Sequence, residues 1–109
     1  MTEPDVVFAR TQQADARLLT VMGEIDLAVA RRFAEELDAL VDPASTTGLV
    51  DLSAVTFIDS SGIRELLGAK RNAEAKGGQL VLVNPSAPSR RVLEVSGVWD
   101  EFAVREAPR

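Results

Sequence analysis

The 109-residue sequence contains no cysteine and no histidine, and only five of its side chains are aromatic, four phenylalanines and one tryptophan. Without cysteine the chain has no disulfide and no thiolate nucleophile. Without histidine it has no imidazole base and lacks the common zinc ligand sets. Few enzyme chemistries remain possible, so the composition favours a binding or regulatory protein that is not an enzyme.

Long apolar runs are also missing, although 46% of the residues are hydrophobic. No stretch approaches the roughly 20 apolar residues that a membrane-spanning helix requires. The first residues, Met1 to Asp5, are acidic and no apolar segment follows them, unlike a secretory signal. We therefore expect one domain located in the cytoplasm, without membrane association.

Positive charge is scarce and dispersed. The chain has 12 Lys and Arg against 17 Asp and Glu, which gives a formal net charge of −5. The basic residues occur in scattered pairs such as Arg31-Arg32 and Arg90-Arg91. Nucleic-acid binding usually requires a concentrated basic face, so the charge pattern favours a protein partner and no nucleic acid.

Four apolar segments predict strands. Residues 6–11 and 17–22 are short and rich in β-branched residues, and the polar residues between them predict an antiparallel hairpin. Residues 48–52 and 79–84 are almost continuously apolar, as in central parallel strands joined through a helix. The expected fold class is α/β, with a mixed sheet whose first strand is antiparallel and with helices packed on it.

Three amphipathic segments predict helices. The first begins after a cap at Asp26, places Leu27 on its apolar face and extends to Val41. The second runs from Ser60 or Ser61 to about Lys76, and the third covers residues 89–96. The last residues, 103–109, carry no apolar pattern and predict a frayed tail, so the core of the domain is expected within about residues 6–102.

The segment Asp59-Ser60-Ser61-Gly62, between a predicted strand and the second helix, is the most informative part of the sequence. Asp59, Ser60 and Ser61 are all good N-cap residues, because a short side-chain oxygen can accept hydrogen bonds from the free N–H groups of the first helical turn. A simple cap is one interpretation. However, one cap leaves a spare hydroxyl on a loop at the positive end of the helix dipole, where a phosphate is tolerated. A phosphorylatable serine is the other interpretation.

Three segments together resemble the STAS-domain family of bacterial anti-sigma-factor antagonists. They are Gly23-Glu24-Ile25-Asp26, the run from Phe57 to Ile63 that contains Asp59-Ser60-Ser61-Gly62, and the run from Gly77 to Asn84. They occur in the order found in the family, and the resemblance extends from about Val6 to Phe102. Arg64 and Glu65 depart from the family pattern, which is commonly small or apolar at these positions.

The resemblance implies a partner switch. Ser60, the serine directly after the aspartate, is then the residue phosphorylated by an anti-sigma factor that is itself a serine kinase. The unphosphorylated chain binds this anti-sigma factor and so frees a sigma factor, phosphorylation abolishes binding, and a phosphoserine phosphatase completes the cycle. The other residues expected in this partner-binding region are Asp26, Asp59, Ser61, Gly62, Ile63 and Arg64.

Asp26 has two interpretations, an N-cap alone or, by the resemblance, an acidic residue near the phosphorylated serine. Together with Asp51 and Asp59 it could also suggest a metal site. Carboxylates at strand and loop ends more often form caps and turns, so no metal is predicted. Gly77-Gly78 lacks the Lys-Ser/Thr that follows in nucleotide-binding loops and predicts a helix stop, so no cofactor is predicted either.

Three other functions remain open. The same module could switch a signalling partner that is not an anti-sigma factor. It could bind a small ligand, which a deep apolar pocket would favour. Finally, Ser60 could be an enzymatic nucleophile, but its base would have to be Lys70 or Lys76 from the far end of the helix, which disfavours this alternative.

Overall fold

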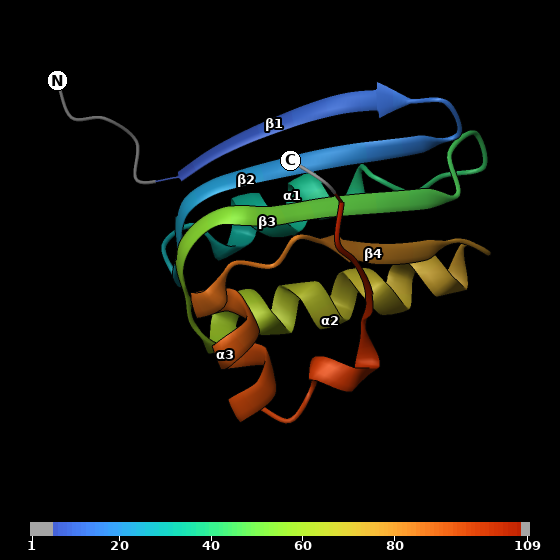
Figure 1. Cartoon of the computed structure of the whole chain (residues 1–109). Coiled ribbons are helices and arrows are strands. Elements are labelled where there is room, and N and C mark those ends of the chain that lie inside the picture. Colours follow the sequence, from blue (N-terminus) through green and yellow to red (C-terminus); the bar gives the residue numbers. More distant parts are fainter. Residues whose placement is uncertain (1–5, 108–109) are drawn as a thin grey trace, which may run out of the picture.

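The computed structural model of the chain describes residues 6–107 (Figure 1). One sheet contains five strands in the order β1-β2-β3-β4-β5. These strands are β1 (Val6–Gln13), β2 (Ala16–Ile25), β3 (Thr47–Ile58), β4 (Gln79–Val83) and β5 (Ala103–Arg105). The helices are α1 (Ala30–Asp38), α2 (Ser60–Ala75), α3 (Ala87–Val95) and a short 3-10 helix η1 (Trp99–Glu101).

The pairing of the strands confirms the predicted mixed sheet. β1 and β2 form an antiparallel hairpin in which Val6 lies opposite Gly23 and Gln13 lies opposite Ala16. All the other neighbours, β2 with β3, β3 with β4 and β4 with β5, are parallel. Because parallel neighbours run in the same direction, β2 and β3 both deliver their carboxyl ends to one end of the sheet.

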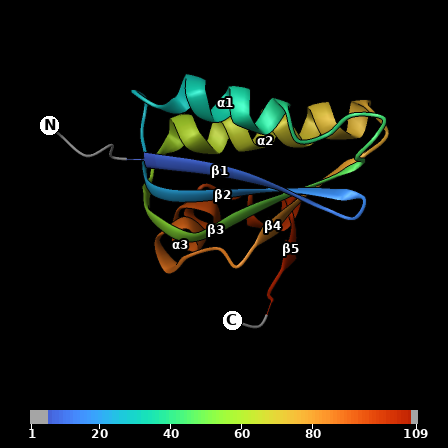
Figure 2. The ribbon, with the colours of Figure 1, turned by 90° about the horizontal axis from the view of Figure 1, so that it is seen from above.

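Two helices cover one face of this sheet. Figure 2 shows α1 and α2 side by side on that face, and α3 packs against β3. Side chains alternate between the two faces of a strand, so every second residue of β2 enters the core. The ring of Phe8 on β1 stacks on that of Phe33 on α1, with centroids 6.0 Å apart. The fully buried members of the core include Leu19, Val21, Ile25, Phe33, Leu52 and Leu66.

The opposite face carries a smaller apolar cluster formed by Leu49, Val81 and Val83. Burial of each such side chain contributes about 1.5–3 kcal/mol, so the larger cluster under α1 and α2 supplies most of the stability. Within residues 6–107, none of the helices has both the length and the apolar character needed to cross a membrane.

The first helix is shorter than the sequence predicts. β2 continues to Ile25, and the chain then turns, with the Val29 N–H donating to the Asp26 carbonyl at 3.2 Å. α1 begins only at Ala30, and no side chain caps it. The prediction that Asp26 is a cap is therefore wrong, because the chain needs a turn to pass from the sheet to the helix layer. Leu27, predicted to face the core, lies in this turn and is 77% exposed.

The predicted loop after residue 52 is instead part of a strand. β3 runs on to Ile58, and its pairing with β2 includes two register shifts. Val55 and Ile58 are buried in the core, while Phe57 between them is 46% exposed. The β-branched composition of this segment favours a strand, and pairing with β2, which extends to Ile25, satisfies its backbone groups.

The prediction of a frayed tail from residue 103 is wrong for the described residues. Ala103–Arg105 form β5, and the Asn84 N–H donates to the Arg105 carbonyl at 2.9 Å. The edge of β4 provides the hydrogen-bonding partners of β5, and the composition of residues 103–105 alone does not show that this edge is available. The remainder of the prediction, for residues 108–109, lies outside the described residues.

Candidate functional site

The residues singled out by sequence gather where β2 and β3 end. Ile25 and Ile58 are paired in register, and the Asp59 N–H donates to the Ile25 carbonyl at 3.2 Å. The turn before α1 and the start of α2 are therefore joined by a backbone hydrogen bond. In Figure 1 this end of the sheet is at the left, where α2 begins.

Asp59 is the N-cap of α2. Its backbone is extended, and its carboxylate accepts hydrogen bonds from the N–H groups of Ser61 at 2.9 Å and Gly62 at 3.4 Å. The Ser61 hydroxyl also donates to the same carboxylate oxygen. This side-chain hydrogen bond is the largest cause that lowers the pKa of Asp59 below its usual range. Burial opposes it, and the backbone N–H groups of Gly62, Ser61 and Leu27 add to the lowering.

The two adjacent serines have different surroundings. Ser61 is half-buried and its hydroxyl is engaged with Asp59, whereas the side chain of Ser60 is exposed. Ser60 is also the first residue of a 16-residue helix, where the free N–H groups and the helix dipole favour negative charge. Of the three possible caps, Asp59 does the capping, and Ser60 is the one with an accessible hydroxyl.

Asp26 lies next to Asp59 although it caps no helix. The carbonyl of Ile25, the residue before Asp26, accepts a hydrogen bond from the Asp59 N–H, and the N–H of Leu27, the residue after it, lies close enough to the Asp59 carboxylate to help lower its pKa. The Oδ1 atom of Asp26 is buried and has no hydrogen-bond partner within the described chain. Buried polar atoms are rarely left unpaired, so an unpaired Oδ1 in the segment joined to Asp59 favours the functional interpretation of Asp26 over a structural one.

Gly62 and Ile63 are in the core, which corrects their expected place in a contact surface. Ile63 is 5% exposed and belongs to the main apolar cluster. A Cβ atom at Gly62 would lie 2.7 Å from Ile58 Cγ1 and 2.9 Å from Ile25 Cγ2. Glycine is therefore required for the first turn of α2 to pack against the strand ends. Both residues are buried in the first turn of α2, which also carries Ser60.

Arg64 is exposed, four residues after Ser60 and so on the same side of the first turns of α2. None of the ion pairs formed among residues 6–107 involves Arg64. Its guanidinium is therefore free to meet a partner or a phosphate.

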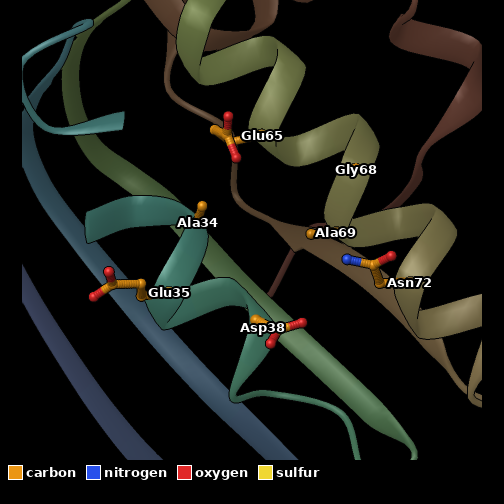
Figure 3. A pocket seen from close by; sticks show the side chains of 7 residues that line it. All are labelled: Ala34, Glu35, Asp38, Glu65, Gly68, Ala69 and Asn72. Carbon is orange, nitrogen blue, oxygen red and sulfur yellow. The ribbon is translucent and has the colours of Figure 1, made fainter. Parts of the chain in front are cut away.

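A groove of about 360 Å³ lies between α1 and α2 (Figure 3). Small residues, Ala34, Gly68 and Ala69, leave the space between the helices. The groove is also bordered by the carboxylates of Glu35, Asp38 and Glu65 and by Asn72. A small-ligand function would need a deep apolar pocket, and this acidic groove does not provide one.

The lysines required by the enzymatic alternative are engaged elsewhere. Lys70 pairs with Glu74 at 2.9 Å, and Lys76 lies 3.6 Å from Asp38. Ten residues of helix separate Ser60 from Lys70, a rise of about 15 Å. A proton cannot pass directly over this distance, so neither lysine is placed to activate Ser60. Among the described residues, no group of three or more carboxylates converges as a metal site.

Two exposed apolar side chains near Ser60 were not expected from sequence. Leu27 follows the half-buried Asp26, and Phe57 precedes the end of β3 by one residue. Their exposure could have been inferred only from knowing that Leu27 lies in a turn and that Phe57 occupies an outward-facing strand position.

Comparison with known proteins gives one family. The STAS domain model matches residues 8–108. The anti-sigma F factor antagonist of Lysinibacillus sphaericus is 30% identical over 92 residues, which cover 82% of this chain and 79% of that protein.

Solved structures agree on the fold. An anti-sigma factor antagonist from Mycobacterium paratuberculosis superposes with a TM-score of 0.81 at 24% identity, covering 95% of this chain and 89% of that one. The anti-sigma factor antagonist SpoIIAA in its unphosphorylated form gives 0.71 at 25% identity, covering 94% and 90%. SpoIIAA of Bacillus in its phosphorylated form gives 0.66 at 25% identity, covering 94% and 93%.

Proposed function

Because the chain belongs to the STAS domain family, we propose that it is an anti-sigma factor antagonist that phosphorylation of Ser60 switches off. The observation that carries this proposal is the exposed Ser60 hydroxyl at the start of α2, directly after the capping Asp59 and beside a Ser61 whose hydroxyl is already engaged. The names of the relatives support an anti-sigma factor as the partner. The solved structures of SpoIIAA in its unphosphorylated and phosphorylated forms support a phosphorylation switch.

In the unphosphorylated state, the surface around Ser60 is compatible with a protein interface. The serine presents a neutral hydroxyl, and the charge of Asp59 is largely satisfied by its hydrogen bonds within the chain. A partner that covers this surface therefore has one neutral polar group to accommodate at Ser60. By binding the anti-sigma factor here, the chain frees the sigma factor.

Phosphorylation changes the charge of this surface without a change of fold. Transfer forms a bond between Ser60 Oγ and the γ-phosphorus of ATP, releases ADP and passes the hydroxyl proton to a base of the kinase. The new group carries about −1.5 to −2 charges beside Asp59 and Asp26. The free protein tolerates it at the helix N-terminus, where water also solvates it.

In a complex, the partner would have to desolvate this phosphate. A loss of only ~2–4 kcal/mol lowers affinity by about one and a half to three decades, which is enough to exchange partners. The kinase is the anti-sigma factor itself, a phosphoserine phosphatase restores the hydroxyl, and the cycle takes place in the cytoplasm.

Site mapping and binding test this proposal together. The chain is incubated with ATP and each purified anti-sigma factor of the serine-kinase class from the same genome, and the phosphate is located by peptide mass spectrometry. We expect the phosphate on Ser60. Ser60→Ala should bind but resist phosphorylation, and Ser60→Glu should fold normally but bind at least about tenfold more weakly.

Ser61→Ala is the matched control, because it removes the neighbouring hydroxyl and leaves Ser60 in place. It should still be phosphorylated on Ser60. A phosphate on Ser61 with Ser60 untouched, or full binding by Ser60→Glu, would disprove the switch. Binding to no anti-sigma factor at all would instead favour a different signalling partner for the same module.

A further inference from the structure

We propose that Leu27 and Phe57 form the apolar anchor through which the unphosphorylated chain binds its protein partner beside Ser60. The inference rests on the proposed function and adds to it the side chains that supply the affinity. Leu27 is 77% exposed in the turn before α1, and Phe57 is 46% exposed near the end of β3.

The strand pairing places these two residues on adjoining segments. Phe57 lies opposite Glu24, and Ile58 lies opposite Ile25, in neighbouring parallel strands. Leu27 follows Ile25 by two residues. The segments that carry Leu27 and Phe57 therefore leave the same end of the sheet next to each other.

Both anchor residues are held close to the switch. The backbone N–H of Leu27 lies close enough to the Asp59 carboxylate to help lower its pKa, and Asp59 caps the helix that begins at Ser60. Phe57 is three residues before Ser60, and the hydrogen bond from Asp59 to the Ile25 carbonyl joins the two segments at 3.2 Å. Leu27, in the turn after β2, and Phe57, near the end of β3, therefore lie on two segments that flank the start of α2.

The fold does not need these side chains for its core. Ile25, two residues before Leu27, and Ile58, the residue after Phe57, fill the core and are at most 2% exposed. A single exposed apolar residue is ordinary, but two large ones on adjoining segments at the end of the sheet where Ser60 lies indicate an interaction surface. Val95, at 82% exposure the most exposed large apolar residue of the described chain, lies instead on the last turn of α3.

The occupant that fits this surface is a protein with apolar pockets, the same partner that reads the state of Ser60. Interface affinity is concentrated in a few large side chains at a water-excluded centre. Burial of Leu27 and Phe57 would place Ser60 in or next to that centre. The anchor therefore makes the interface sensitive to phosphate, because a charge in a dry region must be desolvated.

The test measures binding of alanine variants to the purified serine-kinase anti-sigma factors of the same genome by isothermal titration calorimetry. We expect Leu27→Ala and Phe57→Ala each to lower affinity by about 10- to 100-fold, the usual range for an interface hot spot. Val95→Ala is the matched control and should bind within about twofold of wild type. The melting temperatures of all three variants, measured by circular dichroism, should be close to that of wild type, since exposed side chains contribute little to stability.

The outcomes separate this inference from the proposed function. Wild-type affinity in both anchor variants, with binding still lost in Ser60→Glu, would overturn the anchor and leave the switch intact. Loss of binding in the anchor variants, with full binding by Ser60→Glu, would support the anchor and overturn the switch. An equal loss in Val95→Ala would also overturn the anchor, and binding by no anti-sigma factor would overturn both proposals.

Discussion

Asp59, Ser60 and Ser61 are three similar residues with three separate tasks. The Asp59 carboxylate accepts hydrogen bonds from N–H groups of the first turn of α2. The Ser61 hydroxyl donates to the same carboxylate, and Ser60 remains exposed. A cap made by Ser60 itself would have engaged the hydroxyl that a kinase must reach. The division among neighbours therefore reconciles a stable helix start with a modifiable one.

The Asp59 carboxylate should make stability depend on pH. Its pKa is lowered by the Ser61 hydroxyl and the N–H groups around it, so its contribution is present above the unfolded pKa of about 3.9 and is lost as pH falls through the lower folded pKa. Asp59→Asn keeps a good cap and should remove this part of the acid dependence. The measurement is urea unfolding of both proteins from pH 7 to pH 2.5.

Other carboxylates set the background of this experiment. The pKa of Asp42 is also lowered, chiefly by its hydrogen bond with Arg17, and it contributes equally in both proteins. The difference between wild type and variant therefore isolates Asp59. Parallel pH profiles for the two proteins would contradict the assignment.

Asp26 should matter for switching and little for stability. Its buried Oδ1 has no partner to lose, so Asp26→Asn should change the free energy of unfolding by less than about 1 kcal/mol. Removal of a charge next to Ser60 should alter phosphorylation by about tenfold, which corresponds to ~1.4 kcal/mol. Kinase assays and thermal melts of one preparation measure both effects. A large loss of stability with unchanged phosphorylation would make Asp26 a structural residue.

At the scale of elements, features set by neighbouring residues could be predicted from the sequence, and features set by tertiary packing could not. The hairpin, the start of α2 and the parallel pairing of β3 with β4 follow from short signals such as turn residues, caps and apolar runs. The turn at residues 26–29 was not predicted, because the residue types that cap helices also occur in turns. Only the packing of α1 over the sheet distinguishes a turn from a helix start here.

The candidate site divides in the same way. Asp59 and Ser60 were singled out from three neighbouring residues and a family resemblance. The structure shows Asp59 as the cap of α2 and Ser60 as exposed, and their roles in a switch stay a prediction. The exposure of Leu27 and Phe57 depends on which face each segment turns to solvent. That choice depends on residues far away in sequence, so no local pattern contains it.

Two glycines of α2 should respond in opposite ways to the same substitution. Gly62→Ala places a Cβ 2.7 Å from Ile58 and 2.9 Å from Ile25, so packing must shift and stability should fall by about 1–3 kcal/mol. Gly68→Ala is the matched control, because nothing lies within 4 Å of its Cβ. It should stabilise the helix by about 0.5–1 kcal/mol.

Urea unfolding of the two alanine variants measures this difference. Partner affinity in Gly62→Ala should also fall, because the first turn of α2 carries Ser60. Equal stabilities for the two variants would show that the first turn has room to move, and the rigid placement of Ser60 would have to be abandoned.

On the scale of the whole molecule, the sheet joins the switch to the rest of the core. β2 and β3, the two longest strands, end directly before Asp26 and Asp59, while β4 and β5 extend the same sheet to its far edge. Under the proposed function, phosphorylation at one end needs no rearrangement at the other. The proposed signal is a change of surface charge on a chain whose net charge is already −5.

The C-terminal edge of this sheet provides the last prediction. Val104 packs against the core, the Arg105 carbonyl accepts from the Asn84 N–H at 2.9 Å, and the Ala107 N–H donates to Asn84 Oδ1 at 2.9 Å. A chain that ends at Phe102 loses these contacts and exposes the edge of β4. Its stability should fall by about 2–5 kcal/mol, from a few hydrogen bonds of ~1 kcal/mol each and one apolar side chain.

A chain that ends at Ala107 is the control, because it keeps all of these contacts. Thermal melts of the two truncated proteins should differ by at least about 10 °C, since 1 kcal/mol shifts the midpoint of a domain of this size by roughly 4–8 °C. The shorter chain should also aggregate more readily, because an uncovered strand edge can pair with another copy. Melting of both proteins at the same temperature would mean that β5 adds nothing to the fold, and that the frayed tail expected from composition describes these residues better than a strand.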